Sequence, residues 1–236
     1  MLLVAELRLG LMISGRGSNM MSIVRAIEVG ELRAGIALVV CNHGDAPGLA
    51  WARERGLQVA LFERRDYPSR EAQNAAMARR MAEAGVELVA MAGFDRLITR
   101  EIFQRFEGRI VNIHPSLLPA FCGTLHAQAD ALKYGVKITG CTVHFVTEGA
   151  VDGGPIIIQA AVPVLKDDSV ETLAARILEQ EHRIYPRAVQ LYAEGRLRVE
   201  GRRVVISEAE KAVGTGADRV SRGEGRSGLQ STATGF

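Results

Sequence analysis

The sequence predicts an α/β protein with a Rossmann-like, mostly parallel sheet and helices on both faces, becoming a mixed sheet in the C-terminal part. Apolar runs typical of strands alternate with helical segments from residue 7 to residue 114, as in successive βαβ units. The run Ile36–Cys41 is almost continuously apolar, as expected for a strand buried on both faces. After residue 115 this alternation stops, and two strand-like segments follow each other.

In the first part of the chain, the spacing of the apolar residues predicts each element. Strands are expected over residues 7–14, 36–41, 59–62, 86–92 and 109–114. Helices are expected over residues 19–29, 48–56, 69–85 and 99–106. Met20, Ile23 and Ile27 share one face of the first helix, and Ser69 is suited to cap the third.

The second part is expected to be less regular. Its predicted elements are a helix over 125–134, strands over 138–146 and 155–164, and a hairpin with strands over 197–199 and 202–206. Asp168-x-x-Glu171 matches a capping box that opens a helix ending near Ile184. Pro186 fits the first turn of a further helix that ends near Gly195.

We expect one domain over residues 1–207, with one half over about 7–108 and a second over about 109–207. The segment 208–236 is rich in Gly, Ser, Thr and charged residues and offers few side chains for a core. It is therefore expected to be a disordered tail.

Composition argues against several classes of protein. With 236 residues and a net charge of +2, the chain has too little positive charge to suggest a nucleic-acid partner. It shows no basic N-terminal region with a long apolar core, and no uncharged run of the roughly 18 residues that span a membrane. The expectation is a cytoplasmic protein with neither a membrane nor a nucleic acid as partner.

The cysteines favour the same compartment. Cys41, Cys122 and Cys141 are widely spaced and odd in number, so neither a zinc site nor a disulfide framework is indicated. Cys122 lies in a loop beside a glycine, with no neighbouring residue that would activate a thiol. We interpret it as a bystander in a reducing environment.

The loop Ser14-Gly15-Arg16-Gly17-Ser18-Asn19 lies between a strand and a helix and is a candidate phosphate site. Glycines allow a tight turn, and the N–H groups at a helix start attract anions. Met20 stands where a dinucleotide site would have its third glycine, and the second strand ends without an acid, so NAD is disfavoured. A plain βα turn remains the alternative.

A second candidate site lies at the end of the strand over 109–114. Asn112 and His114 are two residues apart and therefore share one face, while Ile113 points to the other. Pro115 should end the strand. An imidazole can exchange protons near neutral pH, and a carboxamide can stabilise an oxyanion. The alternative is a strand-end Asn beside a structural His.

Two acids are further candidates. Asp152 precedes Gly153-Gly154, which suggests a loop that bends around something, although an ordinary turn residue would look the same. Glu181 falls on the apolar stripe of its helix with Ile177 and Leu178, so it lies either at the rim of the core or against a ligand.

Taken together, these segments resemble the phosphoribosylglycinamide formyltransferase family, from about Leu9 to Val205. The similarity rests on the segments 13–19, 92–94, 112–119, 142–145, 151–155 and 180–182. Asn-x-His-Pro-Ser is shared by formyltetrahydrofolate-using transferases of this fold. The Gly-Ser-Asn loop and Gln-Glu-His are narrower and point to the glycinamide ribonucleotide branch.

The resemblance implies direct transfer of a formyl group from 10-formyltetrahydrofolate to the amine of 5′-phosphoribosylglycinamide, in purine biosynthesis. A tetrahedral intermediate is expected, with no metal and no covalent enzyme intermediate. The half over 7–108 would bind the phosphate, and the half over 109–207 would bind folate and carry catalysis. Both partners would be small molecules, and the protein would be a monomer or a homodimer.

The resemblance also implies roles for particular residues. Asn112 would donate to the oxyanion, His114 would stabilise it and exchange protons, and Asp152 would favour the charged form of His114. The expected ribonucleotide-binding residues are Gly15, Arg16, Gly17, Ser18, Asn19 and Glu181. The expected folate-binding residues are Arg70, Phe94, Asp95, Arg96, Leu97, Ile98 and Asn112.

Three departures from the family pattern bear on these roles. Asp95 stands where the family usually has Met. The loops 120–126 and 147–152 are each one residue longer than usual, and the second extension is expected to bear on the distance from Asp152 to His114. The alternatives left open are a formyltetrahydrofolate hydrolase, a sugar-amine formyltransferase and a nucleotide-binding homologue without catalysis.

Overall fold

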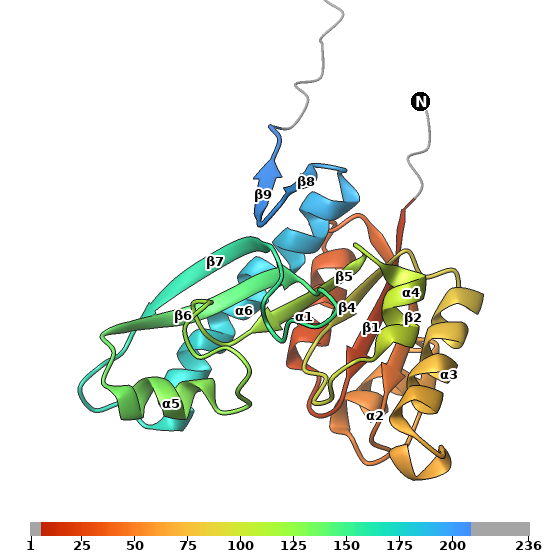
Figure 1. Ribbon diagram of the computed structural model, residues 1–236, viewed down its shortest axis with the longest axis horizontal. Helices are drawn as coiled ribbons and strands as arrows, with labels where there is room; N and C mark the ends of the chain where they lie inside the picture. The colour runs from red at the N-terminus through yellow and green to blue at the C-terminus, as the bar shows by residue number, and fades with distance from the viewer. Residues whose placement is uncertain (1–5, 209–236) are drawn as a thin grey trace, which may run out of the picture.

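The predicted fold class is confirmed by the computed structural model, which describes residues 6–208. The strands described are β1 (Leu7–Ile13), β2 (Ala34–Cys41), β3 (Val59–Leu61), β4 (Leu88–Met91), β5 (Ile110–His114), β6 (Ile138–Phe145), β7 (Ile156–Pro163), β8 (Leu197–Glu200) and β9 (Arg203–Ile206). They form one sheet in the order β3-β2-β1-β4-β5-β6-β7-β9-β8 (Figure 1). The strands β1 to β5 pair in parallel, and β6 pairs antiparallel with both β5 and β7, which makes the sheet mixed.

Helices cover both faces of the sheet. The helices are α1 (Ser18–Glu28), α2 (Pro47–Glu54), α3 (Arg70–Glu83), α4 (Arg100–Phe106), α5 (Ala127–Tyr134) and α6 (Val170–Ala193), with a 3-10 turn at Arg64–Asp66. Buried residues of α1, α2, α5 and α6 join one core cluster, whereas those of α3 and α4 join a second. The two clusters lie on opposite faces, since alternate residues of each central strand belong to different clusters.

This alternation sets the direction of the side chains at the end of β5. Val111 and Ile113 belong to the core cluster that α6 covers. Asn112 and His114 therefore face the side of α3 and α4, as the period of two predicts. The helix α4 ends at Phe106, and its buried residues share a core cluster with Ile110 at the start of β5. That cluster contains neither Asn112 nor His114.

The predicted break between two C-terminal helices is wrong. The helix α6 is continuous from Val170 to Ala193, with Pro186 inside it. A proline within a helix costs about 3 kcal/mol through its missing donor and its ring. Ile184, Tyr185 and Val189 are buried beside it, and each such side chain stabilises by about 1.5–3 kcal/mol. Burial on both sides of Pro186 therefore outweighs the local penalty.

The observed cap of α3 agrees with the prediction, whereas the observed cap of α6 differs from it. The Ser69 hydroxyl accepts a hydrogen bond from the Ala72 N–H at 3.1 Å, as predicted for the start of α3. At the start of α6 the capping box is formed by Ser169 and Thr172, one residue later than predicted. Asp168 instead forms a two-point ion pair with Arg176, with both N–O distances at 2.8 Å. Arg176, about two helical turns further along, draws the carboxylate out of the capping position.

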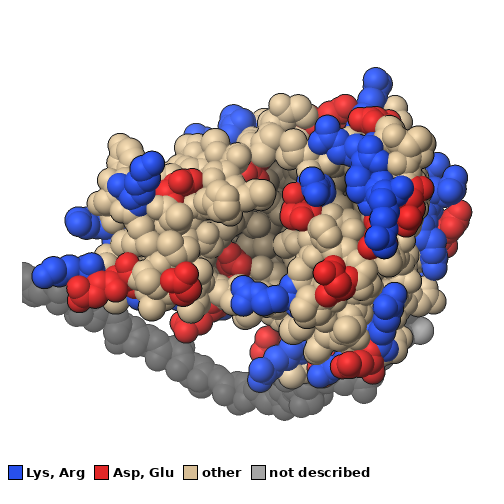
Figure 2. Space-filling model, turned by 90° about the horizontal axis from the view of Figure 1, so that it is seen from below, with Lys and Arg blue, Asp and Glu red and all other residues tan. Residues whose placement is uncertain are grey.

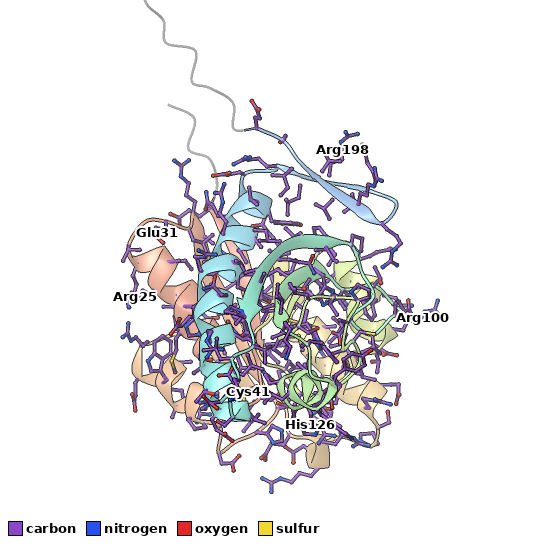
Figure 3. All side chains as sticks on the ribbon, turned by 90° about the vertical axis from the view of Figure 1, so that its left-hand side faces the viewer. Arg25, Glu31, Cys41, Arg100, His126 and Arg198 are labelled. Atoms are coloured by element: carbon purple, nitrogen blue, oxygen red, sulfur yellow. The ribbon has the colours of Figure 1, made fainter. Side chains whose placement is uncertain are left out.

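The C-terminal hairpin of β8 and β9 forms as predicted and lies at the end of the molecule opposite α5 (Figure 3). Figure 3 marks the two ends by Arg198 on the hairpin and His126 beside α5. The predicted disordered tail over 208–236 lies, apart from Glu208, outside the described residues. Among helices within residues 6–208, none combines the length and the apolar character that crossing a membrane requires.

Two glycines allow β6 to approach its neighbours closely. A Cβ atom on Gly140 would lie 1.9 Å from the carbonyl oxygen of Ala160, and one on Gly154 would lie 1.8 Å from that of Phe145. Both contacts are with backbone atoms, which cannot move without disturbing the sheet. Gly154 thus lets the chain return to β7 immediately after Asp152.

We predict that Gly154→Ala lowers the free energy of unfolding by about 2–3 kcal/mol, because the added methyl group overlaps the β6 backbone. Urea unfolding measures this. Gly35→Ala in β2 is the control, since the nearest atom to its Cβ is 3.9 Å away; it should change stability by less than about 1 kcal/mol. Equal stability of the two variants would show that Gly154 does not lie tightly against the β6 backbone.

Candidate active site

The predicted site residues gather where the parallel strands end. Figure 2 shows the molecule from below the view of Figure 1, the side toward which β1 runs, and the surface is hollowed near the centre of this view. The loop after β1, the segment after β4 and the end of β5 all reach this edge, because parallel neighbours finish together.

Asn112, His114 and Asp152 form one polar cluster, as the sequence led us to expect. The Asp152 carboxylate lies 3.2 Å from Nδ1 of His114 through Oδ2 and 3.5 Å from Nδ2 of Asn112 through Oδ1. The His114 and Asp152 side chains are 6% and 12% exposed, so this polar pair is held almost out of water. A charge contact at this depth is screened far less than one on the surface.

The extra residue in the loop before Asp152 does not separate it from His114. Asp152 has a φ of 49°, in the left-handed region that Asp and Asn adopt more readily than most residues. This turn, followed by the close approach of Gly154 to β6, brings the carboxylate back over the end of β5. The local backbone conformation therefore keeps Asp152 in contact with His114 although the loop is one residue longer.

The loop after β5 closes the cluster from the other side. The backbone N–H of Gly123 donates to Asp152 Oδ2 at 2.9 Å, and the carbonyl of Phe121 lies 2.9 Å from Nε2 of His114. Both ring nitrogens of His114 thus face acceptors, a carboxylate and a carbonyl.

His144 belongs to the candidate site, although the sequence analysis did not include it among the candidate residues. It lies directly opposite Asn112 in the antiparallel β5–β6 register, and its Nε2 is 3.4 Å from Nδ2 of Asn112. Burial lowers the pKa of His144, with the backbone hydrogen bond to Phe145 and the charge of Asp152 opposing that shift. The ring is therefore neutral at pH 7, donates from Nδ1 to Phe145 O at 2.8 Å, and accepts from Asn112.

His144 could have been found from the sequence only with the strand register in hand. The alternation of Thr142, Val143 and His144 places the imidazole on one face of β6, but not opposite a particular residue of β5. Phe121 and Gly123 act through backbone atoms, and their residue types carry no signal for that role.

The loop between β1 and α1 has the form predicted for an anion site. Gly17 adopts a left-handed φ of 72° immediately before α1 starts at Ser18. The Gly48 N–H donates to the carbonyl of Gly15 at 3.0 Å, and a Cβ on Gly48 would lie 2.8 Å from that oxygen. Close packing against α2 therefore fixes the loop and leaves the N-terminus of α1 in place.

Asn19 and Glu181 meet although they are far apart in the sequence. Nδ2 of Asn19 donates to Oε2 of Glu181 at 2.7 Å, and both residues are 7% exposed. Burial raises the pKa of Glu181, and the hydrogen bond from Asn19 partly offsets this. Oδ1 of Asn19 is buried with no hydrogen-bond partner, so it remains free to accept one.

These residues line a cavity of about 510 Å³, which we call the Asn19 cavity. Its wall includes Arg16, Ser18, Asn19, Gly93, Ile113, Pro115 and Glu181. Four of the predicted ribonucleotide-binding residues are thus brought together, and Gly15 and Gly17 shape the loop behind them.

A second cavity of about 260 Å³, the Leu97 cavity, lies on the other side of β5. Its wall includes Met91, Arg96, Leu97, Ile98, Asn112, His144 and Asp152. Phe94 packs against the core cluster of α3 and α4. Arg70 is exposed at the start of α3 and Asp95 is bound by neighbouring polar residues, so neither lines this cavity.

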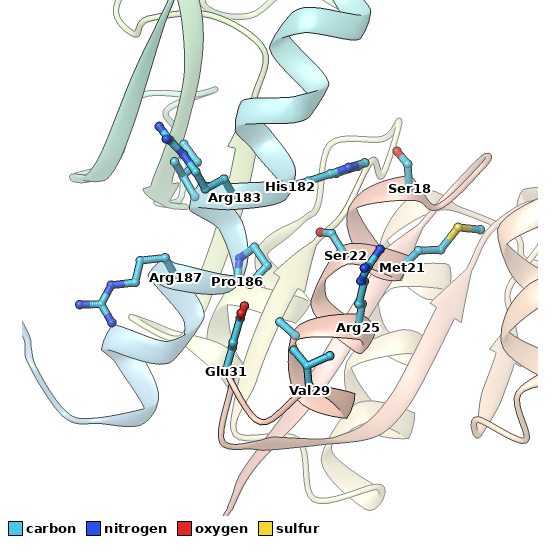
Figure 4. Close-up of a pocket in the computed structure, with 12 residues that line it drawn as sticks. Ser18, Met21, Ser22, Arg25, Val29, Glu31, His182, Arg183, Pro186 and Arg187 are labelled. Atoms are coloured by element: carbon cyan, nitrogen blue, oxygen red, sulfur yellow. The ribbon is translucent and has the colours of Figure 1, made fainter.

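A larger cavity, of about 910 Å³, lies elsewhere, on the outer surface between α1 and α6 (Figure 4). His182 points toward Ser18 in this groove, whereas Arg183 and Arg187 point away from α1. It contains none of Asn112, His114 and Asp152. The size of a cavity therefore does not identify the candidate reactive centre. The polar cluster beside the two smaller cavities identifies it.

Across residues 6–208, no group of three or more His, Cys, Asp or Glu is placed to hold a metal ion.

Comparison with known proteins gives a consistent result. Residues 7–189 match the family model described as formyl transferase. Phosphoribosylglycinamide formyltransferase of Haemophilus influenzae is 39% identical over 193 residues, which cover 82% of this chain and 90% of that protein. The crystal structure of glycinamide ribonucleotide transformylase 1 from Symbiobacterium toebii has 52% identity and a TM-score of 0.84, covering 86% of this chain and 95% of that one.

Longer relatives match over a part of their length. The trifunctional purine biosynthetic protein adenosine-3 of Drosophila pseudoobscura pseudoobscura is 44% identical over 193 residues. That match covers 81% of this chain and 14% of the relative, and the corresponding Gallus gallus protein is covered to 19%. The chain thus corresponds to a small portion of these trifunctional proteins.

The cysteine environments predict one reactive thiol. Cys122 is exposed, whereas Cys41 and Cys141 are buried. Burial raises the pKa of the Cys41 thiol, and it raises the pKa of the Cys141 thiol to about 12. A chromogenic disulfide reagent should react rapidly with one thiol in the folded protein and with all three after denaturation. Cys122→Ser should abolish the rapid reaction. A rapid phase that survives this substitution would contradict the assignment.

The buried His144 predicts a loss of stability in mild acid. Its pKa is lowered in the folded protein, so below about pH 6.5 the unfolded chain binds a proton that the native site does not. The contribution is complete above that pH and is lost as the pH falls toward the folded value. His144→Gln should reduce the slope of the free energy of unfolding between pH 7 and pH 5 by up to about 1.4 kcal/mol per pH unit.

Urea unfolding at several pH values measures this slope. The exposed His126 provides the control, since His126→Gln should leave the slope as in the wild type. His182, whose pKa burial also lowers, is present in all three proteins and cancels in the comparison. Identical slopes for His144→Gln and the wild type would contradict a buried neutral His144.

Proposed function

Because the chain belongs to the formyl transferase family, we propose that it transfers the formyl group of 10-formyltetrahydrofolate to the amine of 5′-phosphoribosylglycinamide. This is a step of purine biosynthesis. The observation that carries the proposal is the position of the end of β5 between two cavities. Asn112 lines the Leu97 cavity, and Ile113 and Pro115 line the Asn19 cavity. Two substrates bound in these cavities would meet at the polar cluster.

The ribonucleotide fits the Asn19 cavity by charge and by hydrogen bonding. Its phosphate suits the N-terminus of α1, where free N–H groups and the helix dipole favour an anion and Arg16 adds positive charge. The free Oδ1 of Asn19 and the carboxylate of Glu181 offer acceptors for ribose hydroxyls or the glycinamide end. Folate suits the Leu97 cavity, with Arg96, Leu97 and Ile98 along one side.

The reaction needs oxyanion stabilisation and one net proton transfer. The amine nitrogen forms a bond to the formyl carbon, and the bond from that carbon to N10 of the folate breaks after a tetrahedral intermediate. One proton leaves the attacking nitrogen and one is gained by N10, so the sum is balanced without a metal or an external base. Groups placed for these tasks accelerate such steps by about 10²–10⁴-fold each.

The cluster supplies groups of the required kinds. Nδ2 of Asn112 makes two long contacts, of 3.4 Å to His144 and 3.5 Å to Asp152, which it can exchange for an oxyanion at small cost. His144 holds the carboxamide so that its N–H groups, and not its oxygen, face the cluster. This orientation supports oxyanion stabilisation by Asn112.

His114 and Asp152 provide the proton-transfer pair. Asp152 holds Nδ1 of His114, which leaves Nε2 as the group that can reach the reacting atoms. In this structure Nε2 lies 2.9 Å from the carbonyl oxygen of Phe121. A substrate oxygen therefore reaches Nε2 only by displacing this carbonyl, which assigns the loop 120–126 a part in substrate entry.

We predict that His114→Ala and Asp152→Asn each lower kcat by at least about 10²-fold, since each removes a group that exchanges or directs a proton. Steady-state turnover of 10-formyltetrahydrofolate and phosphoribosylglycinamide measures this. Asp45→Asn is the matched control, because Asp45 is exposed and outside the cluster, and this variant should retain kcat. Circular dichroism verifies that all three variants fold.

Wild-type kcat in His114→Ala and Asp152→Asn would overturn the assigned roles. A competition assay with the ribonucleotide, a nucleotide-sugar amine and water as acceptors tests the substrate itself. The ribonucleotide should be formylated in preference. Preferred formylation of the sugar amine, or hydrolysis without transfer, would overturn the proposed substrate while leaving the chemistry of the cluster in place.

A further inference from the structure

Asp95 lies at the centre of a polar network that the proposed reaction does not use. Its Oδ1 accepts hydrogen bonds from Oγ of Ser14 at 2.9 Å and from Nδ2 of Asn42 at 2.8 Å. Its Oδ2 lies 3.0 Å from Nε2 of His43. We call Ser14, Asn42, His43 and Asp95 the Asp95 network. Its members follow β1, β2 and β4, three strands that are adjacent in the sheet.

The backbone takes part in the same network. The Asp95 N–H donates to Oγ of Ser14 at 2.9 Å, and the Ser14 N–H donates to the carbonyl of Gly93 at 3.0 Å. Further along, the Thr99 N–H donates to Oδ1 of Asn74 at 3.0 Å. The segment 93–98 is therefore held at its start by the Asp95 network and beyond its end by α3.

Core packing does not account for a carboxylate at this position. The Asp95 side chain is 40% exposed, so an apolar side chain of similar size would meet the packing requirement. Burial raises the pKa of Asp95, but hydrogen bonds from Asn42, His43 and Ser14 together outweigh it and leave the pKa below its usual value. The group is thus charged at neutral pH, and hydrogen bonds to a charged acceptor are stronger than neutral ones.

The position of the network matters because the segment 93–98 belongs to both cavities. Gly93 lines the Asn19 cavity, and Arg96, Leu97 and Ile98 line the Leu97 cavity. Asp95 lies between these two parts and is bonded to Ser14, the first residue of the loop that forms the opposite wall of the Asn19 cavity. One carboxylate therefore ties the wall of one cavity to the wall of the other.

We propose that Asp95 is a positioning residue that holds the shared wall of the two substrate cavities against the loop 14–19. Asp95 itself lines neither cavity. It acts through Ser14, through Arg96, whose Nε lies 3.7 Å from its Oδ1, and through the backbone of its own segment. The identity of the two substrates rests on the proposed function. The effect of Asp95 on the position of the shared wall does not depend on that function. Removing the carboxylate should weaken the binding of both substrates, while the cluster of Asn112, His114 and Asp152, which is held by other contacts, keeps its geometry.

The kinetic test compares Asp95→Ala and Asp95→Asn with the wild type. Each should raise the KM for 10-formyltetrahydrofolate and the KM for phosphoribosylglycinamide by about tenfold, with kcat changed less than about threefold. Leu97→Ala provides the contrast, since Leu97 lines only the Leu97 cavity and should raise only the folate KM. Asp45→Ala, an exposed acid in the loop after β2, should change neither.

A double-mutant cycle tests the route through Ser14. If Ser14 acts through Asp95, the Ser14→Ala/Asp95→Ala protein should show KM values no higher than those of Asp95→Ala alone. Additive effects of the two substitutions would overturn the proposed route. Unchanged KM values in both Asp95 variants, or a loss confined to kcat, would overturn the positioning role.

Hydrogen exchange of the unliganded protein separates this inference from the proposed function. Asp95→Ala should speed amide exchange at least about tenfold in peptides covering 14–19 and 93–98, with the peptide covering 110–114 unchanged. Asp45→Ala should change none of them. Absence of formyl transfer in the wild type would overturn the proposed function alone, whereas unchanged exchange in Asp95→Ala would overturn the inference alone. Asp95→Asn, which keeps the shape of the side chain, provides the same comparison should Asp95→Ala fail to fold.

Discussion

The antiparallel register between β5 and β6 is the constraint on which the candidate site depends. It places His144 directly opposite Asn112 and Thr142 opposite His114. The chain that leaves β6 then turns at Asp152 and returns past Gly154, so the carboxylate reaches both side chains at the end of β5. A shift of the register by one residue would move His144 to the other face of the sheet and separate the cluster.

Different neighbours give the two buried histidines His114 and His144 different chemistry. His144 is neutral because its ring is enclosed and its Nδ1 is bound to a carbonyl, so it serves as an acceptor that orients Asn112. His114 is also buried, but it has a carboxylate on one side and a carbonyl on the other. Two residues of the same type, both beside Asp152, would therefore take an orienting role and a proton-exchanging role in the proposed reaction because their neighbours differ.

The Asn19 cavity and the Leu97 cavity share parts of their walls. Each shared part is a short segment of chain whose successive residues line different cavities. The end of β5 contributes Asn112 to one cavity and Ile113 to the other, because successive residues of a strand face opposite sides. The segment after β4 contributes Gly93 to one and Leu97 to the other. Two substrates bound here would approach each other across a strand end, with the polar cluster at the point of contact.

Local sequence patterns determined much of the secondary structure and the face on which several candidate site residues lie. Apolar runs and helical spacing predicted the alternating elements up to β5, and the period of two placed Asn112 and His114 on one face. The loop at Gly17 and the turn at Gly154 were visible as glycines beside polar residues. These features depend on neighbours within a few residues, so the sequence alone contains the physical information that sets them.

The tertiary structure decided what depends on distant partners. Pro186 lies within α6 because the sheet buries the residues around it, and Asp168 leaves the capping position because Arg176 binds it. The roles proposed for His144 and Asp95 come from contacts with Asn112 and Ser14, which are separated from them by many residues. Such contacts follow from strand order and register, which arise from the packing of the whole sheet and have no signature in any short stretch of sequence.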